Sequence, residues 1–175
     1  IAILGIGLFW MQKDHYKAYQ QWNKAQMFYN NKAYEAALEV YEPLYPLLKH
    51  KPEFLFEAAQ SLSKTGQYEK ANEYLERAVL LSSDPMLYYV MAKNEQCLGE
   101  YRQAEKHLLH AIDILPERIY PYYLLMNLYT EPSYFQPAKL KMAIDSVLTK
   151  KPKVESSAIK EMKEKARSML NNTSI

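Results

Sequence analysis

Residues 66–79 read GQYEKANEYLERAV, and residues 99–112, which lie 33 positions further along the chain, read GEYRQAEKHLLHAI. In each stretch a tyrosine stands two positions after a glycine, and apolar residues then recur every three or four positions. That period places the apolar side chains on one face of an α-helix. The glycine is typical of the residue that follows the end of a helix. Each stretch therefore predicts a turn followed by an amphipathic helix.

The pattern continues on both sides of these stretches, so the chain contains an internal repeat of 33 or 34 residues. The turn positions are Lys32, Gly66, Gly99 and Ser133, and the aromatic positions two residues later are Tyr34, Tyr68, Tyr101 and Phe135. The small residues of the second helix of each repeat are Ala37, Ala71, Ala104 and Ala138. The corresponding residues of the first helix are Ala25, Ala59 and Ala92, with Met126 in the fourth repeat. Coincidence does not keep several rows in one phase, so we expect four helix–turn–helix units.

This unit resembles the tetratricopeptide (TPR) repeat, which is a helix–turn–helix of about 34 residues. The resemblance covers roughly residues 18–150. It implies an all-α fold, a right-handed TPR-like helical solenoid of about four repeats plus a C-terminal capping helix. Pro52 and Pro85 fit this scheme because proline suits the first turn of a helix. We expect an apolar segment at 1–12, the repeats at 13–150, and a linker with the capping helix at 151–175.

The first eleven residues, IAILGIGLFWM, carry no charged side chain. They are fewer than the roughly 20 residues that a helix needs to span a bilayer. Three interpretations are open: the end of a transmembrane helix, the remnant of a signal peptide, or a buried helix of a soluble fold. The run is apolar on all sides instead of along one stripe, which favours the first interpretation. Residues 1–12 are therefore predicted to connect the repeats to a membrane.

The C-terminal segment reads as one more helix over residues 156–170, with Ser156 or Ser157 as its N-cap. Its apolar stripe consists of Ile159, Met162, Ala166 and Met169. Together with the apolar start and the repeats, the stretch KPKVESSAIKEMK at 151–163 resembles the C-terminus of some bacterial O-antigen ligase/polymerase-type membrane proteins. The resemblance implies a binding or assembly module on an envelope-polysaccharide protein in the bacterial cell membrane. The alternative is a free-standing TPR adaptor, or a membrane-anchored scaffold, unrelated to glycans.

Composition and motifs argue against catalysis and against nucleic acid. The net charge is only +2, which is too small to indicate a nucleic-acid partner. The sequence lacks the common nucleophile, zinc-protease and phosphate-loop signatures. His107 and His110 share a helix face, but a closed zinc site needs four ligands. We expect no enzyme activity in this module, no cofactor and no metal.

One row of aromatic residues follows the repeat in the first helix of each unit. It consists of Trp22, Phe56, Tyr89 and Tyr123. A second row, four residues further on, consists of Gln26, Gln60, Lys93 and Asn127. In a TPR stack these helices line a concave groove, so the rings are expected to take side chains of an extended protein or peptide partner and the amides to bond its backbone. A glycan stacked on the rings is a second possible ligand, and packing between neighbouring helices is the interpretation without a ligand.

Overall fold

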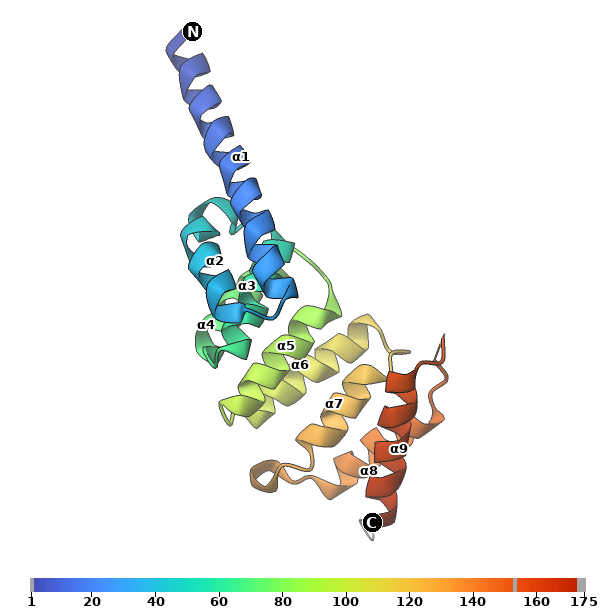
Figure 1. Cartoon of the computed structure of the whole chain (residues 1–175). Coiled ribbons are helices and arrows are strands. Elements are labelled where there is room, and N and C mark those ends of the chain that lie inside the picture. The colour runs from blue at the N-terminus through green and yellow to red at the C-terminus, as the bar shows by residue number, and fades with distance from the viewer. Residues whose placement is uncertain (1, 153, 173–175) are drawn as a thin grey trace. The chain divides into compact units, whose positions relative to one another are not determined.

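The computed structural model describes the backbone of residues 2–152 and 154–172 and the side chains of residues 15–152 and 154–171. The chain divides into two compact units, Ile1–Ser83 and Asp84–Ile175. The first unit contains α1 (Ala2–Asn30), α2 (Tyr34–Leu48), α3 (Pro52–Lys64) and α4 (Tyr68–Val79) (Figure 1). The second unit contains α5 (Pro85–Cys97), α6 (Tyr101–Ile114), α7 (Tyr120–Leu128), the short 3₁₀ helix η1 (Pro132–Tyr134), α8 (Pro137–Thr149) and α9 (Ser157–Asn172). No strand occurs among the described residues, so the predicted all-α class and the C-terminal helix are confirmed.

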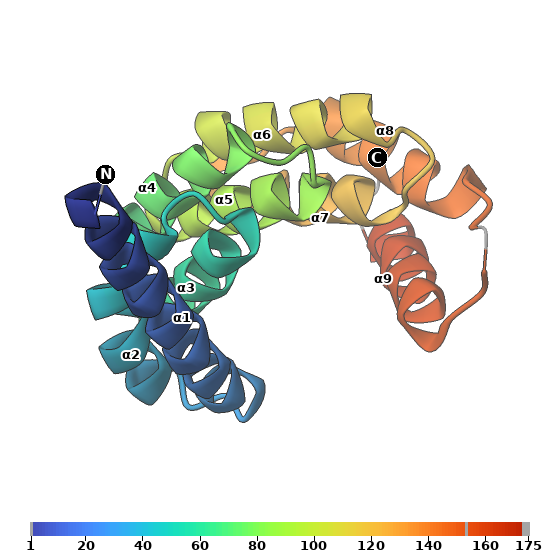
Figure 2. The ribbon, with the colours of Figure 1, turned by 90° about the horizontal axis from the view of Figure 1, so that it is seen from above.

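The first and second helices of the repeats alternate along the chain. We call the first helices, α1, α3, α5 and α7, the A helices, and the second helices, α2, α4, α6 and α8, the B helices. Within the second unit the A helices α5 and α7 form one layer and the B helices α6 and α8 form the other (Figure 2). The last helix, α9, packs against α8 and also meets α7. Each repeat is therefore a helical hairpin, as the sequence predicts.

The turns of the first three repeats share one backbone geometry. The predicted turn residues Lys32, Gly66 and Gly99 have φ of 60°, 81° and 78°, which is the left-handed region. In each case the next N–H donates to a carbonyl five residues earlier, which closes the helix end. The three bonds are Ala33 to Phe28 at 2.9 Å, Gln67 to Leu62 at 2.9 Å, and Glu100 to Glu95 at 2.8 Å. Glycine adopts this conformation without strain, whereas Lys32 adopts it at a cost.

The fourth repeat departs from the predicted register, and two assignments there are wrong. Ser133 lies between α7 and α8, as predicted for a turn residue, but it forms part of η1. Phe135 precedes the N-cap of α8, has φ of −64° and is exposed. Ala138 is exposed as well, because α8 begins two residues later than the repeat predicts. Leu140 takes the place of the small residue: its N–H bonds to Gln136 just as that of Ala71 bonds to Gln67.

The alanine rows lie in the tightest parts of the core. Ala25, Ala59 and Ala92 are fully buried, and so is Met126, the predicted fourth member of their row. The B-helix residues Ala37, Ala71 and Ala104 are fully buried too. Interiors are packed to crystal density, so a larger side chain has no room at these positions without displacing the neighbouring helix.

The described part of the chain begins and ends in a helix. The helix α1 runs without a break through the boundary expected between residues 12 and 13. The side chains of residues 2–14 lie outside the described part, so the predicted membrane connection there stays a prediction. In the part of the chain that the structure describes, no helix is both long and apolar enough to cross a bilayer. At the other end, Ser156 Oγ accepts from the N–H of Ile159 at 3.3 Å, which confirms the predicted cap of α9.

Candidate functional site

In the first unit, the predicted rows meet at a carboxylate that the sequence analysis does not single out. Trp22 Nε1 of α1 donates to Glu57 Oε2 of α3 at 2.7 Å, and Gln26 Nε2 donates to Glu57 Oε1 at 2.8 Å. The hydroxyl of Tyr41 in α2 donates to Oε2 as well, at 3.0 Å. Glu57 thus joins the first repeat to the second. Glu57 lies three residues before Gln60 on the same helix, so both side chains lie on one side of α3.

The tyrosine hydroxyls around this carboxylate are held in their protonated, donating form. Burial, followed by the nearby charge of Glu57, raises the pKa of Tyr41 far above its usual range. Burial raises the pKa of Tyr29 too, and its hydroxyl donates to Gln60 Oε1. Three of the predicted partner-binding residues are half-buried and already have hydrogen-bond partners inside the fold: Trp22, Gln26 and Gln60. Phe56 is half-buried beside them.

In the second unit the two predicted rings lie differently. Tyr89 of α5 is only 5% exposed, and its ring meets the ring of Tyr120 of α7 edge-on, with 5.1 Å between centroids. Tyr120 stacks on Tyr123 at 6.5 Å, and Lys165 Nζ of α9 lies 5.4 Å from the centre of the Tyr123 ring. Burial raises the pKa of both Tyr89 and Tyr120. Tyr89 thus belongs to the core, and Tyr123 is the half-buried ring on this face.

The polar row of the second unit is less engaged. Lys93 is exposed on α5. Asn127 is half-buried on α7, and its Oδ1 is fully buried without a hydrogen-bond partner among the described residues. An unpaired buried acceptor costs about 1–3 kcal/mol. Because the oxygen is fully buried, a ligand does not reach it in this conformation.

A pocket of about 610 Å³ opens in the second unit, with Tyr120 in its lining. Its walls come from the α6–α7 loop, the first turn of α7, the linker after α8, and α9. The lining residues are Leu115, Pro116, Glu117, Arg118, Ile119, Tyr120, Pro152, Val154, Ile159 and Met162. Eight of these ten residues are apolar or aromatic, which is the usual character of a ligand pocket. Sequence reasoning missed this pocket, because its walls come from segments that are far apart in the sequence.

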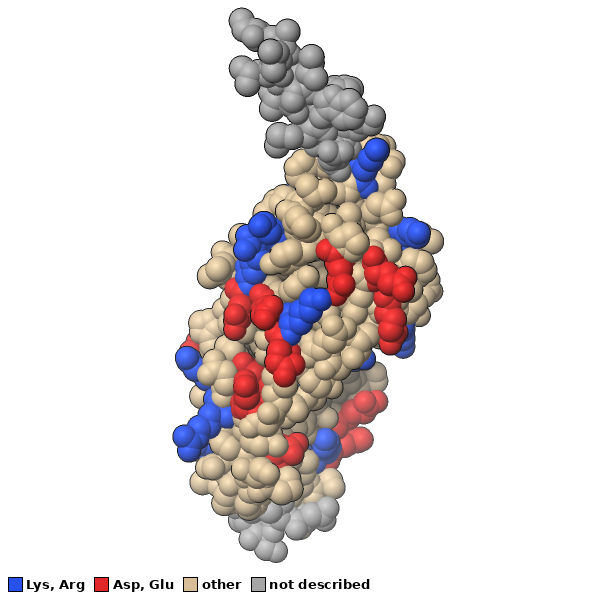
Figure 3. Space-filling model, turned by 90° about the vertical axis from the view of Figure 1, so that its left-hand side faces the viewer, with Lys and Arg blue, Asp and Glu red and all other residues tan. Residues whose placement is uncertain are grey.

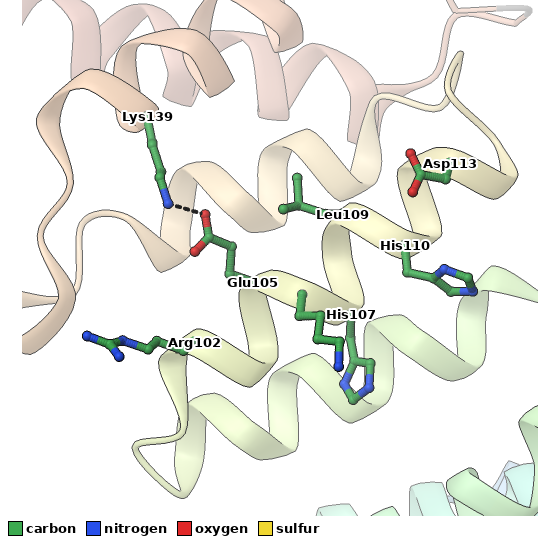
Figure 4. Close-up of a pocket in the computed structure, with 8 residues that line it drawn as sticks. Arg102, Glu105, His107, Leu109, His110, Asp113 and Lys139 are labelled. Carbon is green, nitrogen blue, oxygen red and sulfur yellow. Dashed lines mark hydrogen bonds and ion pairs between the residues drawn. The ribbon is translucent and has the colours of Figure 1, made fainter.

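A second hollow, of about 480 Å³, lies over α6 and the start of α8 (Figure 4). Glu105 accepts from Lys139 Nζ at 2.7 Å and from the hydroxyls of Tyr129 and Tyr134 at 2.6 Å each. Burial alone raises the pKa of Glu105, but these three hydrogen bonds outweigh it and hold the pKa below its usual value. The cluster fastens α6, α7, η1 and α8 together.

The two histidines of this hollow also have structural partners. His107 Nδ1 lies 2.8 Å from Glu95 Oε1, and Glu95 is almost fully buried. The rings of His107 and His110 both meet Tyr88, with centroids 5.9 and 4.6 Å apart. Across the described residues, no three metal-ligating side chains come together. On the helix face that the two histidines share, both imidazole rings thus contact the ring of Tyr88.

Charge is mixed over the surface shown in Figure 3, where acidic and basic side chains are interspersed. The local excess of positive charge lies at the C-terminal end of the chain. Residues 138–170 carry nine Lys/Arg and four Asp/Glu. Interspersed charges of both signs are ordinary for solvent-exposed helix faces.

Comparisons with known proteins agree with this architecture. Residues 30–111 match the family model of the anaphase-promoting complex (cyclosome) subunit 3. The tetratricopeptide repeat protein 21A of Mus musculus is 35% identical over 86 residues, which are 49% of this chain but only 6% of the mouse protein. The structure of a MamA segment (41-end) from Desulfovibrio magneticus superposes with a TM-score of 0.68 at 19% identity, covering 91% of this chain and 98% of that solved chain.

The fold is that of a TPR-like helical solenoid. A further structure with this architecture is the Yersinia enterocolitica type III secretion chaperone SycD in complex with a peptide of the translocator YopD. It superposes with a TM-score of 0.53 at 16% identity, over 86% of this chain and 92% of SycD. The predicted TPR repeats are thus supported both by sequence relatives and by solved structures.

Proposed function

We propose that this chain is a non-catalytic scaffold whose A helices bind a segment of a protein partner. The observation that carries this proposal is the half-buried Tyr123 ring on α7, with the half-buried Asn127 one turn later on the same helix. An extended peptide offers a side chain for the ring and backbone groups for a neighbouring amide. SycD, whose fold is similar, holds a peptide of its translocator, which supports a peptide as the class of ligand.

The half-buried Phe56 is the candidate ring of the first unit. Trp22 and Gln26 are already bonded to Glu57, so we assign them to holding α1 against α3 rather than to gripping a ligand. In the second unit, Lys93 of the polar row is exposed and provides a positive charge on α5. Binding energy is expected to concentrate in a few rings, as is usual at protein interfaces.

The finer proposal is that the module is appended to a membrane-bound envelope-polysaccharide protein of the O-antigen ligase/polymerase type, in the bacterial cell membrane. The uncharged run at 1–11 and the 151–163 stretch support it. The long helix α1 is consistent with it, because it carries that run directly into the first repeat. A glycan is then a second ligand class for the same rings.

Capture experiments test the binding proposal. The immobilised chain is incubated with a bacterial envelope extract, next to a Phe56→Ala/Tyr123→Ala variant and a matched Tyr16→Ala/Tyr19→Ala variant of exposed tyrosines on α1. We expect the first variant to keep its circular dichroism and lose the captured protein, and the control to retain it. Equal capture by all three chains contradicts the proposal.

The membrane proposal needs a separate measurement. Co-sedimentation with vesicles of bacterial polar lipids compares the full chain with a variant that lacks residues 1–12. We expect only the full chain to sediment with the vesicles. Sedimentation of neither chain favours the free-standing adaptor, and equal sedimentation of both contradicts a membrane connection through residues 1–12.

A further inference from the structure

Hydrogen bonds hold two of the segments that build the apolar pocket beside α9. Lys163 Nζ of α9 donates to the carbonyl of Lys150 at 3.0 Å, and this bond ties α9 to the end of α8. The stripe of α9 packs against the core of the second unit through the fully buried Ala166. On the opposite wall, the N–H of Arg118 donates to the carbonyl of Leu115 at 3.1 Å and closes the α6–α7 loop. A preformed pocket costs little to occupy.

Some of the apolar lining is open to solvent. Val154 is 75% exposed and Leu115 is 38% exposed, while Ile119 forms the buried floor. A pocket of about 610 Å³ is large enough for one or two bulky side chains. It continues the aromatic row of the second unit, because Tyr120 both lines it and contacts Tyr89.

The charge around the pocket selects the ligand. The segment that supplies this wall, described at residues 150–152 and 154–170, carries six Lys/Arg and three Glu, a net charge of +3. The facing wall, residues 115–120, carries Glu117 and Arg118, which cancel. Arg118 is exposed and forms no ion pair among the described residues, and Lys151 and Lys160 are exposed as well. The rim therefore favours a negatively charged partner.

We propose that this pocket binds a bulky apolar side chain carried by an acidic segment of a protein partner. The proposal rests on the proposed scaffold function only in that the ligand is a protein, since it uses residues other than Phe56, Asn127 and Tyr123. The apolar side chain fills the space between Leu115 and Met162. The flanking carboxylates lie near Arg118 and the lysines of the α9 wall.

Fluorescence anisotropy with a synthetic probe tests this. The probe is a labelled peptide in which a central leucine–phenylalanine pair is flanked on each side by three glutamates. We expect replacement of the glutamates by glutamine to weaken binding about tenfold, and a rise in salt from about 0.05 M to about 0.5 M to weaken it similarly. Replacement of the central pair by serines is expected to abolish binding. No binding of the parent peptide, or equal binding of the glutamine peptide, overturns the proposal.

Protein variants locate the site. Leu115→Ser/Val154→Ser removes exposed apolar lining, and Arg118→Glu/Lys160→Glu reverses the rim charge. We expect each to weaken binding of the probe roughly tenfold or more. The matched controls are Leu80→Ser/Met142→Ser, at residues 83% and 70% exposed, and Lys17→Glu/Lys141→Glu. Controls that weaken binding as much as the pocket variants also overturn the assignment.

The two proposals fail separately. If the probe does not bind but envelope capture still depends on Phe56 and Tyr123, only the pocket is wrong. If the probe binds through the pocket while the Phe56→Ala/Tyr123→Ala variant still captures its partner, the aromatic row is wrong and the pocket stands.

Discussion

Trp22 Nε1 on α1 donates a hydrogen bond of 2.7 Å to Glu57 Oε2 on α3, 35 residues further along the chain. The bond joins the A helices of two successive repeats. Because Gln26 and Tyr41 also donate to this carboxylate, one side chain satisfies three donors from two helices. Glu57 is thus a fastening point of the first unit.

Loss of this carboxylate should destabilise the first unit. We predict that Glu57→Ala lowers the free energy of unfolding by about 2–3 kcal/mol, because the half-buried Trp22 and Gln26 and the buried Tyr41 lose their acceptor. Glu76→Ala, at an exposed position of α4, is the control and should change it by less than about 0.5 kcal/mol. Urea denaturation followed by circular dichroism measures both. Similar values for the two variants would show that water replaces the carboxylate at no cost.

The turn at Lys32 offers a stabilising substitution. Its φ of 60° is one that glycine adopts freely, as Gly66 does in the next repeat. We predict that Lys32→Gly raises the free energy of unfolding by about 0.5–1 kcal/mol and that Gly66→Ala lowers it by about 1 kcal/mol. A Cβ at Gly66 meets no atom within 4 Å, so strain in φ is the only cause of its loss. Thermal denaturation should move the two melting temperatures in opposite directions.

The shifted register of the fourth repeat makes two alanines unequal. Ala104 is fully buried, whereas Ala138, 34 residues later, is exposed on α8. We predict that Ala104→Leu costs about 1–3 kcal/mol through overpacking, while Ala138→Leu changes stability by less than about 0.5 kcal/mol. Denaturation midpoints of the two variants decide between this register and the uninterrupted repeat, which predicts equal losses.

The sequence carried enough information for the hairpins but not for their junctions. One row of residues keeps the repeat spacing and is fully buried throughout, because each A helix packs closely against its neighbours at that position. The row consists of Ala25, Ala59, Ala92 and Met126. The later start of α8 could not be predicted from the repeat. An aromatic residue, Phe135, and a small residue, Ala138, stand at the repeat spacing although both are exposed. Glu57 and the pocket beside α9 depend on which side chains of separate helices meet, and no period in the sequence encodes that.

Acid should weaken the Glu105 cluster. The three hydrogen bonds from Lys139, Tyr129 and Tyr134 hold its folded pKa below the ordinary value of 4.5. A carboxyl with a lowered folded pKa contributes stability above its unfolded pKa and loses it as pH falls through the folded pKa. We therefore predict that Glu105→Gln destabilises the protein at neutral pH and that its difference from the wild type shrinks below about pH 4.5. A difference that stays constant from neutral to acid pH contradicts this assignment.

The first described side chain of α1 that is buried is Ala18, at 2% exposure, and Tyr16 just before it is 66% exposed. Packing of α1 on its repeat is therefore expected to begin near residue 18. We predict that deletion of residues 1–11 improves solubility and changes the free energy of unfolding by less than about 1 kcal/mol, since exposed helix ends contribute little by themselves. Ala18→Asp is the comparison, because it buries an unpaired charge and should cost several times more. Urea denaturation and the soluble yield measure both effects. A large loss of stability on deletion would assign residues such as Leu4 and Leu8 to the core and would remove the argument for a membrane-directed segment.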